Sequence, residues 1–238
     1  MEKRTWHEHY ANGVKPDIRF KNETIFSPLE RHARDIPSKP ALIFLDSKIS
    51  YKKLNAAANR FARALADMGV KKGDRVALLM PNIPQFVMAA YGIWKIGAVA
   101  VPHNPLYTDG ELASQLNNSG CVAMVSLDLL AERMIALRNS TPVKHIVVAH
   151  IRDYLGFPKK QLVPIVAKDK HRNVPKADGV HEWLDLQKKY DGADMGADVG
   201  VDSLCLLMYT GGTTGVSKGV MLTHRNFSNV VESFVSWF

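Results

Sequence analysis

The sequence predicts an α/β fold in which helices flank a largely parallel sheet built from βαβ units. Between residues 41 and 149, short apolar runs alternate with segments whose apolar residues recur every three or four positions. The apolar runs hold few polar positions, as expected for strands that are covered on both faces. Parallel neighbours need a crossover connection, and the helical segments between the runs can supply it.

The first predicted unit is a strand at 41–45, followed by a helix that begins after Ser50. Ser50 suits the N-cap, because its hydroxyl can accept a hydrogen bond from a backbone N–H of the first turn. Gly69 is expected to end the helix, since glycine is favoured where helices stop. The apolar residues of this helix form one stripe that we expect to be buried: Leu54, Ala57, Ala58, Phe61, Leu65 and Met68.

Further strands and helices alternate up to residue 149. Pro84 suits the first turn of a helix, because the N–H that proline lacks would have no helical partner there. The side chains of this helix that we expect to face inward are Val87, Ala90, Tyr91 and Trp94, with Gly97 ending it. The other expected elements are strands at 75–80, 98–101, 121–125 and 145–149, and helices at 111–118 and 129–138.

Composition excludes several classes of protein. The chain has 238 residues, of which 46% are apolar and 23% charged, so it is neither disordered nor fibrous. Cys121 and Cys205 are too few and too far apart for a disulfide scaffold or a cysteine zinc site, which favours a reducing compartment. No apolar run approaches the roughly 20 residues that span a bilayer. We therefore expect a cytoplasmic protein.

Residues 150–203 are expected to form a basic, irregular insertion or linker, with one short helix at 183–189. The net charge of the chain is +8, and residues 150–176 alone carry +5. Such a segment is usually a solvated loop. Peripheral contact with an anionic membrane is the alternative, because apolar residues lie between the basic ones. Nucleic-acid binding is disfavoured, since no recognisable binding module is present.

A glycine- and threonine-rich loop joins the last two predicted strands, at 204–208 and 219–222. Glycines let successive backbone N–H groups point into one concavity, and hydroxyls with an ammonium around it suit a polyphosphate. A surface hairpin without a ligand is the alternative that composition leaves open. The P-loop pattern fails because Ser217 precedes the lysine, and no G-x-G-x-x-G occurs. The expected phosphate-binding residues are Thr210, Gly211, Gly212, Thr213, Thr214, Gly215, Ser217 and Lys218.

The run from Tyr209 to Asn226 resembles the AMP-binding signature of the adenylate-forming superfamily, in the form found in long- and medium-chain fatty acid–CoA ligases. Gly211 stands where many relatives have serine, and Ser217 where proline is usual. Neither change removes the loop's threonines or Lys218. Most of the chain shares the resemblance, through further landmarks at 24–44, 49–55, 73–76, 81–86 and 94–108.

The resemblance implies the N-terminal part of the large domain of an acyl-CoA synthetase. It divides the chain into a first α/β subdomain (1–149), the insertion (150–203) and the start of a second subdomain with the phosphate-binding loop (204–238). The implied reaction is a two-step ligation of a fatty acid or other carboxylate, with ATP, Mg²⁺ and CoA. Thr213 is the implied Mg²⁺ contact. The catalytic lysine is expected beyond residue 238, so no catalytic residue is assigned and the chain alone is expected to be inactive.

The last predicted helix begins near His224, which we expect to cap it, and carries an apolar face on which the chain stops. An uncovered face of this kind favours self-association. A non-catalytic module that binds a nucleotide or a partner is the alternative function. A dinucleotide-dependent oxidoreductase is disfavoured, because its glycine fingerprint is absent. The apolar face consists of Phe227, Val230, Val231, Phe234, Val235 and Phe238.

Overall fold

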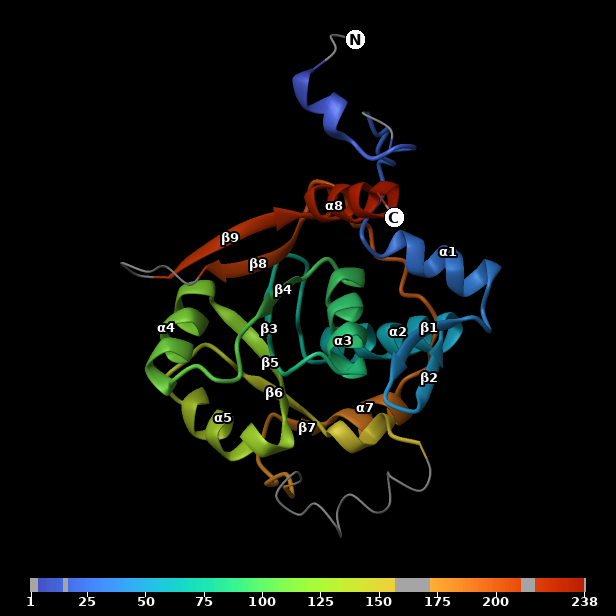
Figure 1. The fold of residues 1–238 in the computed structure, drawn as a ribbon. Helices are drawn as coiled ribbons and strands as arrows, with labels where there is room; N and C mark the ends of the chain where they lie inside the picture. The colour runs from blue at the N-terminus through green and yellow to red at the C-terminus, as the bar shows by residue number, and fades with distance from the viewer. Residues whose placement is uncertain (1–3, 15–16, 157–171, 211–216, 238) are drawn as a thin grey trace.

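A mixed sheet forms the centre of the computed structural model, which describes residues 4–14, 17–156, 172–210 and 217–237 (Figure 1). The seven strands of this sheet lie in the order β7-β6-β5-β3-β4-β8-β9. Every neighbouring pair is parallel except β8 and β9, so the predicted α/β class with a largely parallel sheet is confirmed. The strands are β3 (Arg75–Leu79), β4 (Val99–Pro102), β5 (Cys121–Leu127), β6 (His145–Ala149), β7 (Val180–Glu182), β8 (Leu204–Thr210) and β9 (Lys218–Thr223).

Helices cover both faces of the sheet (Figure 1). Helices α2 and α3 lie on one face and α4 and α5 on the other. Strand β3 feeds both cores in alternation: Val76 and Leu78 face the α2–α3 side, whereas Ala77 and Leu79 face the α4–α5 side. The described helices are η1 (Thr5–His9), α1 (Ser27–Asp35), α2 (Tyr51–Asp67), α3 (Pro84–Lys95), α4 (Asp109–Ser119), η2 (Asp128–Leu130), α5 (Ala131–Arg138), η3 (Ile151–Tyr154), α7 (Trp183–Lys189) and α8 (His224–Trp237).

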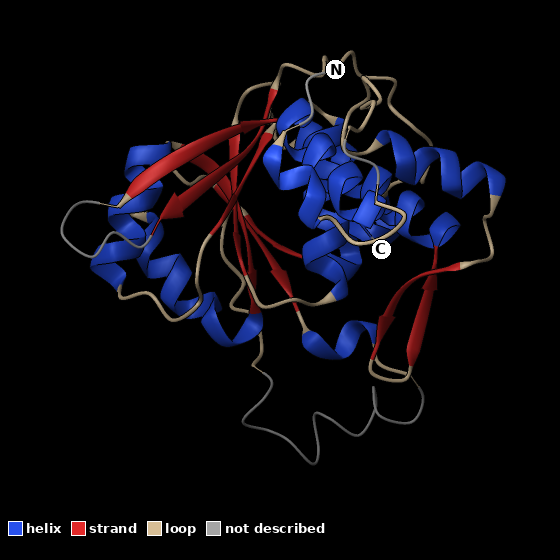
Figure 2. Ribbon diagram, turned by 45° about the horizontal axis from the view of Figure 1, so that its top comes forward, coloured by secondary structure: helices blue, strands red, loops and turns tan. Residues whose placement is uncertain are grey.

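Strands β1 (Pro40–Phe44) and β2 (Ser47–Ser50) form a separate antiparallel hairpin that stands apart from the main sheet (Figure 2). The chain leaves this hairpin directly into α2. The hydroxyl of Ser50 accepts a hydrogen bond from the N–H of Lys53 at 3.4 Å, which confirms the predicted N-cap. Gly69 follows the helix with φ +83°, a conformation that glycine adopts without steric cost.

Helix α3 is buried more completely than its sequence indicated. Val87 and Tyr91, which we expected to face inward, are only half-buried, whereas Met88, Ala89 and Ile93 are fully buried. The prediction assumed a single inward stripe. Val87 and Tyr91 do pack against the buried core, and the further burial of α3 arises because the helix packs against the sheet and also against α2. The two helices approach so closely that a Cβ on Gly92 would lie 2.8 Å from the carbonyl oxygen of Ala58.

The segment 150–203 is more ordered at its end than predicted. Strand β7 pairs in parallel with β6, with Val147 opposite His181, and extends the sheet by one strand. Three residues, Val-His-Glu, are too short a run to show alternation. The short helix expected at 183–189 is confirmed as α7, whereas residues 157–171 of the basic segment lie outside the described residues.

The predicted division of the chain at residues 149 and 203 stays a prediction. Strand β8 lies beside β4, with Leu206 opposite Ala100, so the segment that begins at residue 204 continues the same sheet. Cys121 and Cys205 are free, buried thiols. Among the helices that the structure describes, none is long and apolar enough to cross a membrane.

Candidate functional site

The predicted phosphate-binding loop joins β8 to β9 at the end of the sheet. Because β8 runs parallel to β4, the loop leaves β8 at the edge where the parallel strands have their carboxyl ends. Open α/β sheets usually bind their ligands along that edge. The β8–β9 ladder continues up to the pair Thr210 and Lys218. The loop therefore has a firm base.

Three of the eight expected phosphate-binding residues are described, and they form this base. The hydroxyl of Ser217 donates to the carbonyl oxygen of Thr210 at 2.7 Å, and the hydroxyl of Thr210 donates to the carbonyl oxygen of Lys218 at 3.4 Å. These two hydroxyl protons are thus used within the hairpin. The other five residues lie outside the described residues: Gly211, Gly212, Thr213, Thr214 and Gly215.

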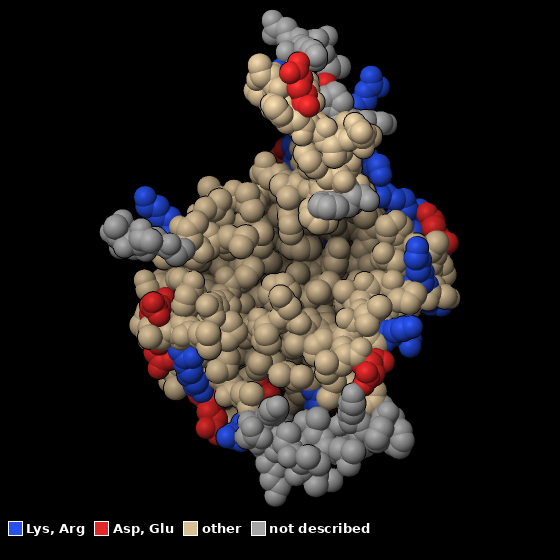
Figure 3. All heavy atoms as spheres, viewed as in Figure 1, with Lys and Arg blue, Asp and Glu red and all other residues tan. Residues whose placement is uncertain are grey.

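Lys218 supplies the positive charge of the hairpin. Its side chain is exposed, and no carboxylate among the described residues forms an ion pair with it. In the space-filling view, basic atoms stand at this end of the hairpin (Figure 3). An ammonium without a protein counter-ion is available to an anionic ligand.

A polar platform supports the strand that leads into the loop. The ring of Tyr209 stacks on that of His103, with centroids 6.1 Å apart and planes at 22°. The Tyr209 hydroxyl donates to Asn118 Oδ1 at 2.6 Å and to the carbonyl oxygen of Gln115 at 3.2 Å. Both acceptors belong to α4. These hydrogen bonds therefore tie Tyr209, the residue before Thr210, to helix α4.

A hydrogen bond to Gln115 fixes the tautomer of the His103 ring. Its Nδ1 lies 2.9 Å from Gln115 Oε1, an acceptor, so Nδ1 carries the proton and Nε2 does not. Burial lowers the pKa of His103, which keeps the ring neutral. The sequence analysis did not single out His103. Its signal was its position two residues after the end of the strand predicted at 98–101.

His224 does not cap the last helix, which corrects our expectation. The Thr223 hydroxyl accepts from the N–H of Asn226 at 3.2 Å, and Asn226 Oδ1 accepts from the N–H of Thr223 at 3.0 Å. Residue 224 comes one position too late for this role. Its ring is instead buried edge-on against Phe26 at 5.6 Å, and burial lowers its pKa to about 4.

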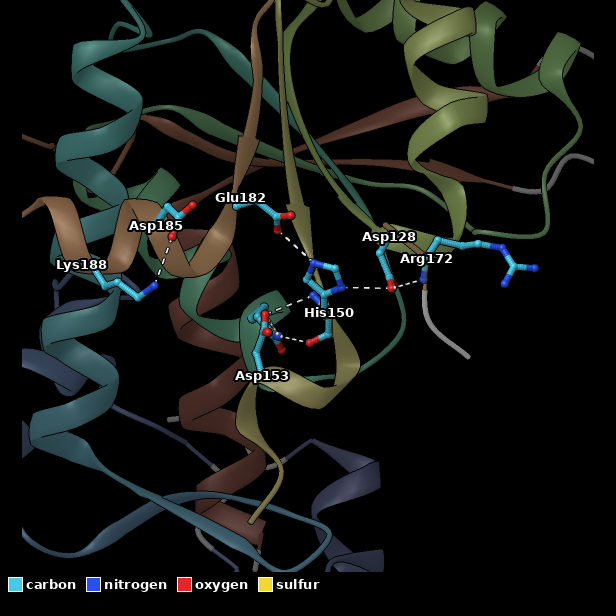
Figure 4. Close-up of polar contacts among 8 residues, drawn as sticks. Asp128, His150, Asp153, Arg172, Glu182, Asp185 and Lys188 are labelled. Carbon is cyan, nitrogen blue, oxygen red and sulfur yellow. Dashed lines mark hydrogen bonds and ion pairs between the residues drawn. The ribbon is translucent and has the colours of Figure 1, made fainter. Parts of the chain in front are cut away.

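A second polar cluster lies along the carboxyl ends of β5, β6 and β7 (Figure 4). Asp128 directly follows β5, His150 directly follows β6, and Glu182 is the last residue of β7. The sequence analysis did not single out these three residues. No group of His, Cys, Asp and Glu side chains within the described ranges could hold a metal ion.

Comparison with known proteins identifies the family. The model of the family described as "AMP-binding enzyme" matches residues 29–237. The chain belongs to the AMP-binding enzyme family. The family that the resemblance of residues 209–226 implies is thereby confirmed.

Curated relatives with similar sequences are named long-chain-fatty-acid–CoA ligases. One from Bacillus subtilis is 34% identical over 241 residues and covers all of this chain. One from Haemophilus influenzae is 36% identical over 241 residues, which is 98% of this chain. The match takes up 43% and 42% of those two proteins, so the chain spans about two fifths of their length.

Solved structures share the fold. A long-chain-fatty-acid–CoA ligase from Archaeoglobus fulgidus aligns over 92% of this chain and 40% of its own, with a TM-score of 0.72 and 24% identity. The inhibitor-bound N-terminal domain of FACL13 from Mycobacterium tuberculosis aligns over 85% of this chain and 44% of its own, with a TM-score of 0.63 and 30% identity. Both agree with the sheet and helix layers described above.

Proposed function

We propose that this chain carries the triphosphate-binding part of an ATP-dependent fatty acid–CoA ligase, an acid–thiol ligase. The match of the AMP-binding enzyme description to residues 29–237 carries this proposal. In the first step, a carboxylate oxygen attacks the α-phosphorus of ATP. This attack forms the acyl adenylate and releases pyrophosphate. In the second, the thiolate of CoA attacks the acyl carbon, forms the thioester and releases AMP.

The residues around the hairpin bind and position the triphosphate in this proposal. Lys218 neutralises charge on the departing pyrophosphate, and the platform of Tyr209 and His103 fixes where the loop starts. Thr210 and Ser217 hold the base of the loop closed. Because the hydroxyl protons of Thr210 and Ser217 already form hydrogen bonds within the hairpin, we expect backbone N–H groups and Lys218 to donate to the phosphates at the base of the loop.

Mg²⁺ fits the composition of the loop. Hydroxyl oxygens are hard ligands, and Mg²⁺ usually combines one or two protein oxygens with phosphate oxygens and water. The ion would neutralise negative charge on the phosphates. Thr213 is the proposed protein ligand, and it lies outside the described residues.

The acyl substrate is proposed as a fatty acid, because the curated relatives named above are long-chain-fatty-acid–CoA ligases. Other carboxylates are the competing substrate class. An anthranilate–CoA ligase in complex with anthranoyl-AMP shares the fold, with a TM-score of 0.71 and 23% identity. Because the 238 residues alone are expected to be inactive, these classes would be ranked by the rates at which residues 1–238, joined to the remaining part of a relative, form thioesters of palmitate, octanoate, benzoate and acetate.

The decisive experiment joins residues 1–238 to the remaining part of the Bacillus subtilis relative and measures ATP–pyrophosphate exchange with fatty acid. We expect exchange by the chimaera and none by the 238 residues alone. Lys218→Ala should lower the chimaera's exchange rate by roughly 100-fold, because a charged donor to the phosphates is lost. The exposed Lys71→Ala variant is the matched control and should exchange normally.

Two outcomes would contradict the proposal. One is exchange by the 238 residues alone at the chimaera's rate, and the other is an unchanged rate in Lys218→Ala. A third outcome would favour the non-catalytic module. In that case the 238 residues would bind MgATP in isothermal titration, while a folded chimaera would form no acyl adenylate.

Self-association through α8 is a further proposal about this chain. The helix exposes 64% of Val230 and 70% of Val235, and Met221 on neighbouring β9 is 65% exposed. Burying these side chains between two copies would remove apolar surface from water. Sedimentation velocity should show a dimer that weakens when Val230 and Val235 are both replaced by serine. A monomer at 100 µM would contradict it.

We also propose a cytoplasmic protein that contacts anionic membranes through 150–176. Support comes from the +5 charge of this segment and from the apolar residues between its basic ones. Vesicles of phosphatidylglycerol should co-sediment the protein, whereas those of phosphatidylcholine should not. Replacing Arg152, Arg172 and Lys176 with glutamine should weaken co-sedimentation, and unchanged binding would contradict this contact.

A further inference from the structure

A cavity of about 760 Å³ lies between helix α2, the β1–β2 hairpin and helix α7. Its walls come from segments that are far apart in the sequence, and contacts of α2 with β1, β2 and α7 hold these walls together. Cavities that bind small ligands usually have volumes of about 300–1,000 Å³. The cavity therefore has the size of a ligand site, and the proposed ligase reaction does not use it.

The cavity is separate from the phosphate-binding hairpin. Helix α7 directly follows β7, and β7 and β9 are the two opposite edges of the seven-stranded sheet. The lining of the cavity includes no residue of β8 or β9. In Figures 1 and 2, the β1–β2 hairpin and the loop end of β8 and β9 lie on opposite sides of the molecule. A ligand in this cavity would thus occupy a second site.

The lining of the cavity contains basic side chains and no acidic one. The basic residues are Lys48, Lys52, Lys53 and Arg60. None of them forms an ion pair with a carboxylate in the part of the chain that the structure describes. Asp46 and Asp153 neighbour lining residues in the sequence, but neither lines the cavity. Four positive charges are therefore available to a ligand.

Arg60 is the most specific of these basic groups. Its side chain is half-buried, and its guanidinium donates no hydrogen bond to any described residue. An arginine has five N–H donors and no acceptor, so all five remain for a ligand. The planar guanidinium matches two oxygens of one phosphate group at once. A bound phosphate would supply the partners that the described chain does not.

Helix α2 places lysines where helices usually carry acidic residues. Lys52 and Lys53 lie in its first turn, which holds no acidic residue. The first turn carries partial positive charge, so lysines there cost free energy that a bound anion would restore. Lys53, Ala57 and Arg60 share one face of the helix, because they are four and three residues apart. The short side chain of Ala57 leaves room between the two cations.

Hydroxyl groups add neutral donors to the lining. Tyr154 Oη accepts from Trp183 Nε1 at 3.2 Å, which leaves its own proton for a further partner. Burial raises the pKa of Tyr154, so this proton stays on the oxygen at neutral pH. Ser50 likewise accepts from the N–H of Lys53 and keeps its proton. This surplus of donors suits a ligand whose oxygens only accept.

The apolar part of the lining strengthens the attraction for an anion. Ile49 and Met88 are 5% and 1% exposed, and half-buried Leu155 lies beside them in the lining. Low-dielectric walls behind charges of one sign focus the electric field into the hollow between them. The basic groups therefore attract an anion more strongly here than they would on a flat, solvated surface.

We propose that this cavity binds a small anion with two or more phosphate groups, held by Arg60 and Lys53 and by the hydroxyl of Tyr154. A single carboxylate would leave most of the four positive charges unmatched. The phosphates can belong to a soluble polyphosphate or to the headgroup of an anionic lipid. The soluble source fits better, because the donors surround a hollow and do not lie on a flat face.

The test is isothermal titration of pyrophosphate, without Mg²⁺, into the 238-residue chain that carries Lys218→Ala. This background removes the ammonium of the hairpin, so the result does not depend on the proposed ligase function. We expect one saturable site. Adding Arg60→Gln should weaken it by about tenfold or more, because a charge-assisted hydrogen bond is lost. Lys71→Gln removes the same charge beyond the other end of α2 and should leave the affinity unchanged.

Lys53→Gln provides a second variant should Arg60→Gln not fold, because its side chain is exposed. It should weaken pyrophosphate binding severalfold. Amide shifts in an NMR titration should concentrate at 47–53 and at Tyr154. No saturable binding up to roughly 5 mM at low salt would overturn the site, as would equal weakening by Arg60→Gln and Lys71→Gln. Displacement of pyrophosphate by vesicles of phosphatidylglycerol, but not of phosphatidylcholine, would overturn the soluble source in favour of a lipid headgroup.

Discussion

The indole N–H of Trp94 donates a 2.7 Å hydrogen bond to the carbonyl oxygen of Cys205. The register between β8 and β9 shifts between Leu204 and Leu206 and gives Cys205 no partner residue. Trp94 reaches the carbonyl oxygen of Cys205 from the core on the α2–α3 side. The side chain of a helix thus satisfies the backbone of the strand that leads to the phosphate-binding hairpin.

Trp94→Phe should destabilise the protein by about 1–3 kcal/mol, because a buried carbonyl loses its donor while the ring contacts with Tyr91 and Phe227 are kept in large part. Urea denaturation at neutral pH measures this change. The matched control is Trp6→Phe at an exposed position, which should change the free energy of unfolding by less than about 0.5 kcal/mol. Equal effects of the two variants would contradict the assigned role.

Gly92→Ala should also destabilise the protein, by about 1–3 kcal/mol, because the added Cβ meets Ala58 O at 2.8 Å and Phe61 Cδ1 at 2.9 Å. The backbone atom cannot move aside without separating α2 from α3. Gly110→Ala in α4 is the control, and we expect it to change the stability in the opposite direction. Nothing lies within 4 Å of its added Cβ, so it should stabilise the helix by up to about 1 kcal/mol. Thermal melts of both variants give the comparison.

Tyr209→Phe should remove the hydrogen bonds to Asn118 and Gln115 and keep the stacking on His103. The expected cost is about 1 kcal/mol of stability, together with weaker MgATP binding, because the first residue of the loop is less firmly placed. Tyr190→Phe also removes a hydroxyl, one that donates to exposed Asp67. It should leave MgATP binding unchanged. Isothermal titration calorimetry measures MgATP binding by both variants. Equal affinities would contradict the role assigned to Tyr209.

His224 should make stability fall at acid pH. Its pKa is lowered to about 4 in the folded chain, so the unfolded chain binds the proton first as pH drops. Stability is therefore full above pH 6.5 and is lost as pH falls from there towards 4, by at most about 1.4 kcal/mol per pH unit. His224→Phe should flatten this part of the profile. An unchanged slope between pH 6 and 4.5 would contradict the burial of a neutral ring.

His150 contributes in the opposite direction. Its pKa is raised in the folded chain, so its stabilisation is fully present below pH 6.5 and is lost as pH rises through the folded-state value. Together with His224, it predicts a stability maximum between the two transitions. Urea midpoints measured from pH 4 to 9 test that shape, and His150→Arg should remove only the alkaline decline.

Local features of the fold could be predicted because they depend on neighbours in sequence. Ser50 and Gly69 mark the ends of α2 through their own backbone chemistry, and the alternation of strands and helices predicted the sheet. Strand β7 was missed because three residues give no period. The burial of Met88, Ala89 and Ile93 in α3 was missed, because it depends on a second packing partner that a single helical stripe does not reveal.

The polar clusters could not be found by local pattern alone. Asp128, His150 and Glu182 are separated by 22 and 32 residues and meet only because β5, β6 and β7 lie side by side. His103 and Tyr209 are brought together by the pairing of β4 with β8 across a hundred residues of chain. Strand order decides both contacts. Only the position of each residue just after, or at the end of, a strand hinted at them.

The pairing of β4 with β8 also sets a timing problem during synthesis on the ribosome. Strand β4 ends at Pro102, whereas its neighbour begins at Leu204. At ordinary elongation rates the free edge of Val99–Pro102 waits roughly 5–20 s for its partner. An unpaired apolar edge can recruit other nascent chains during that interval. Slow translation or chaperone depletion should therefore lower the yield of folded protein without changing the stability of what does fold.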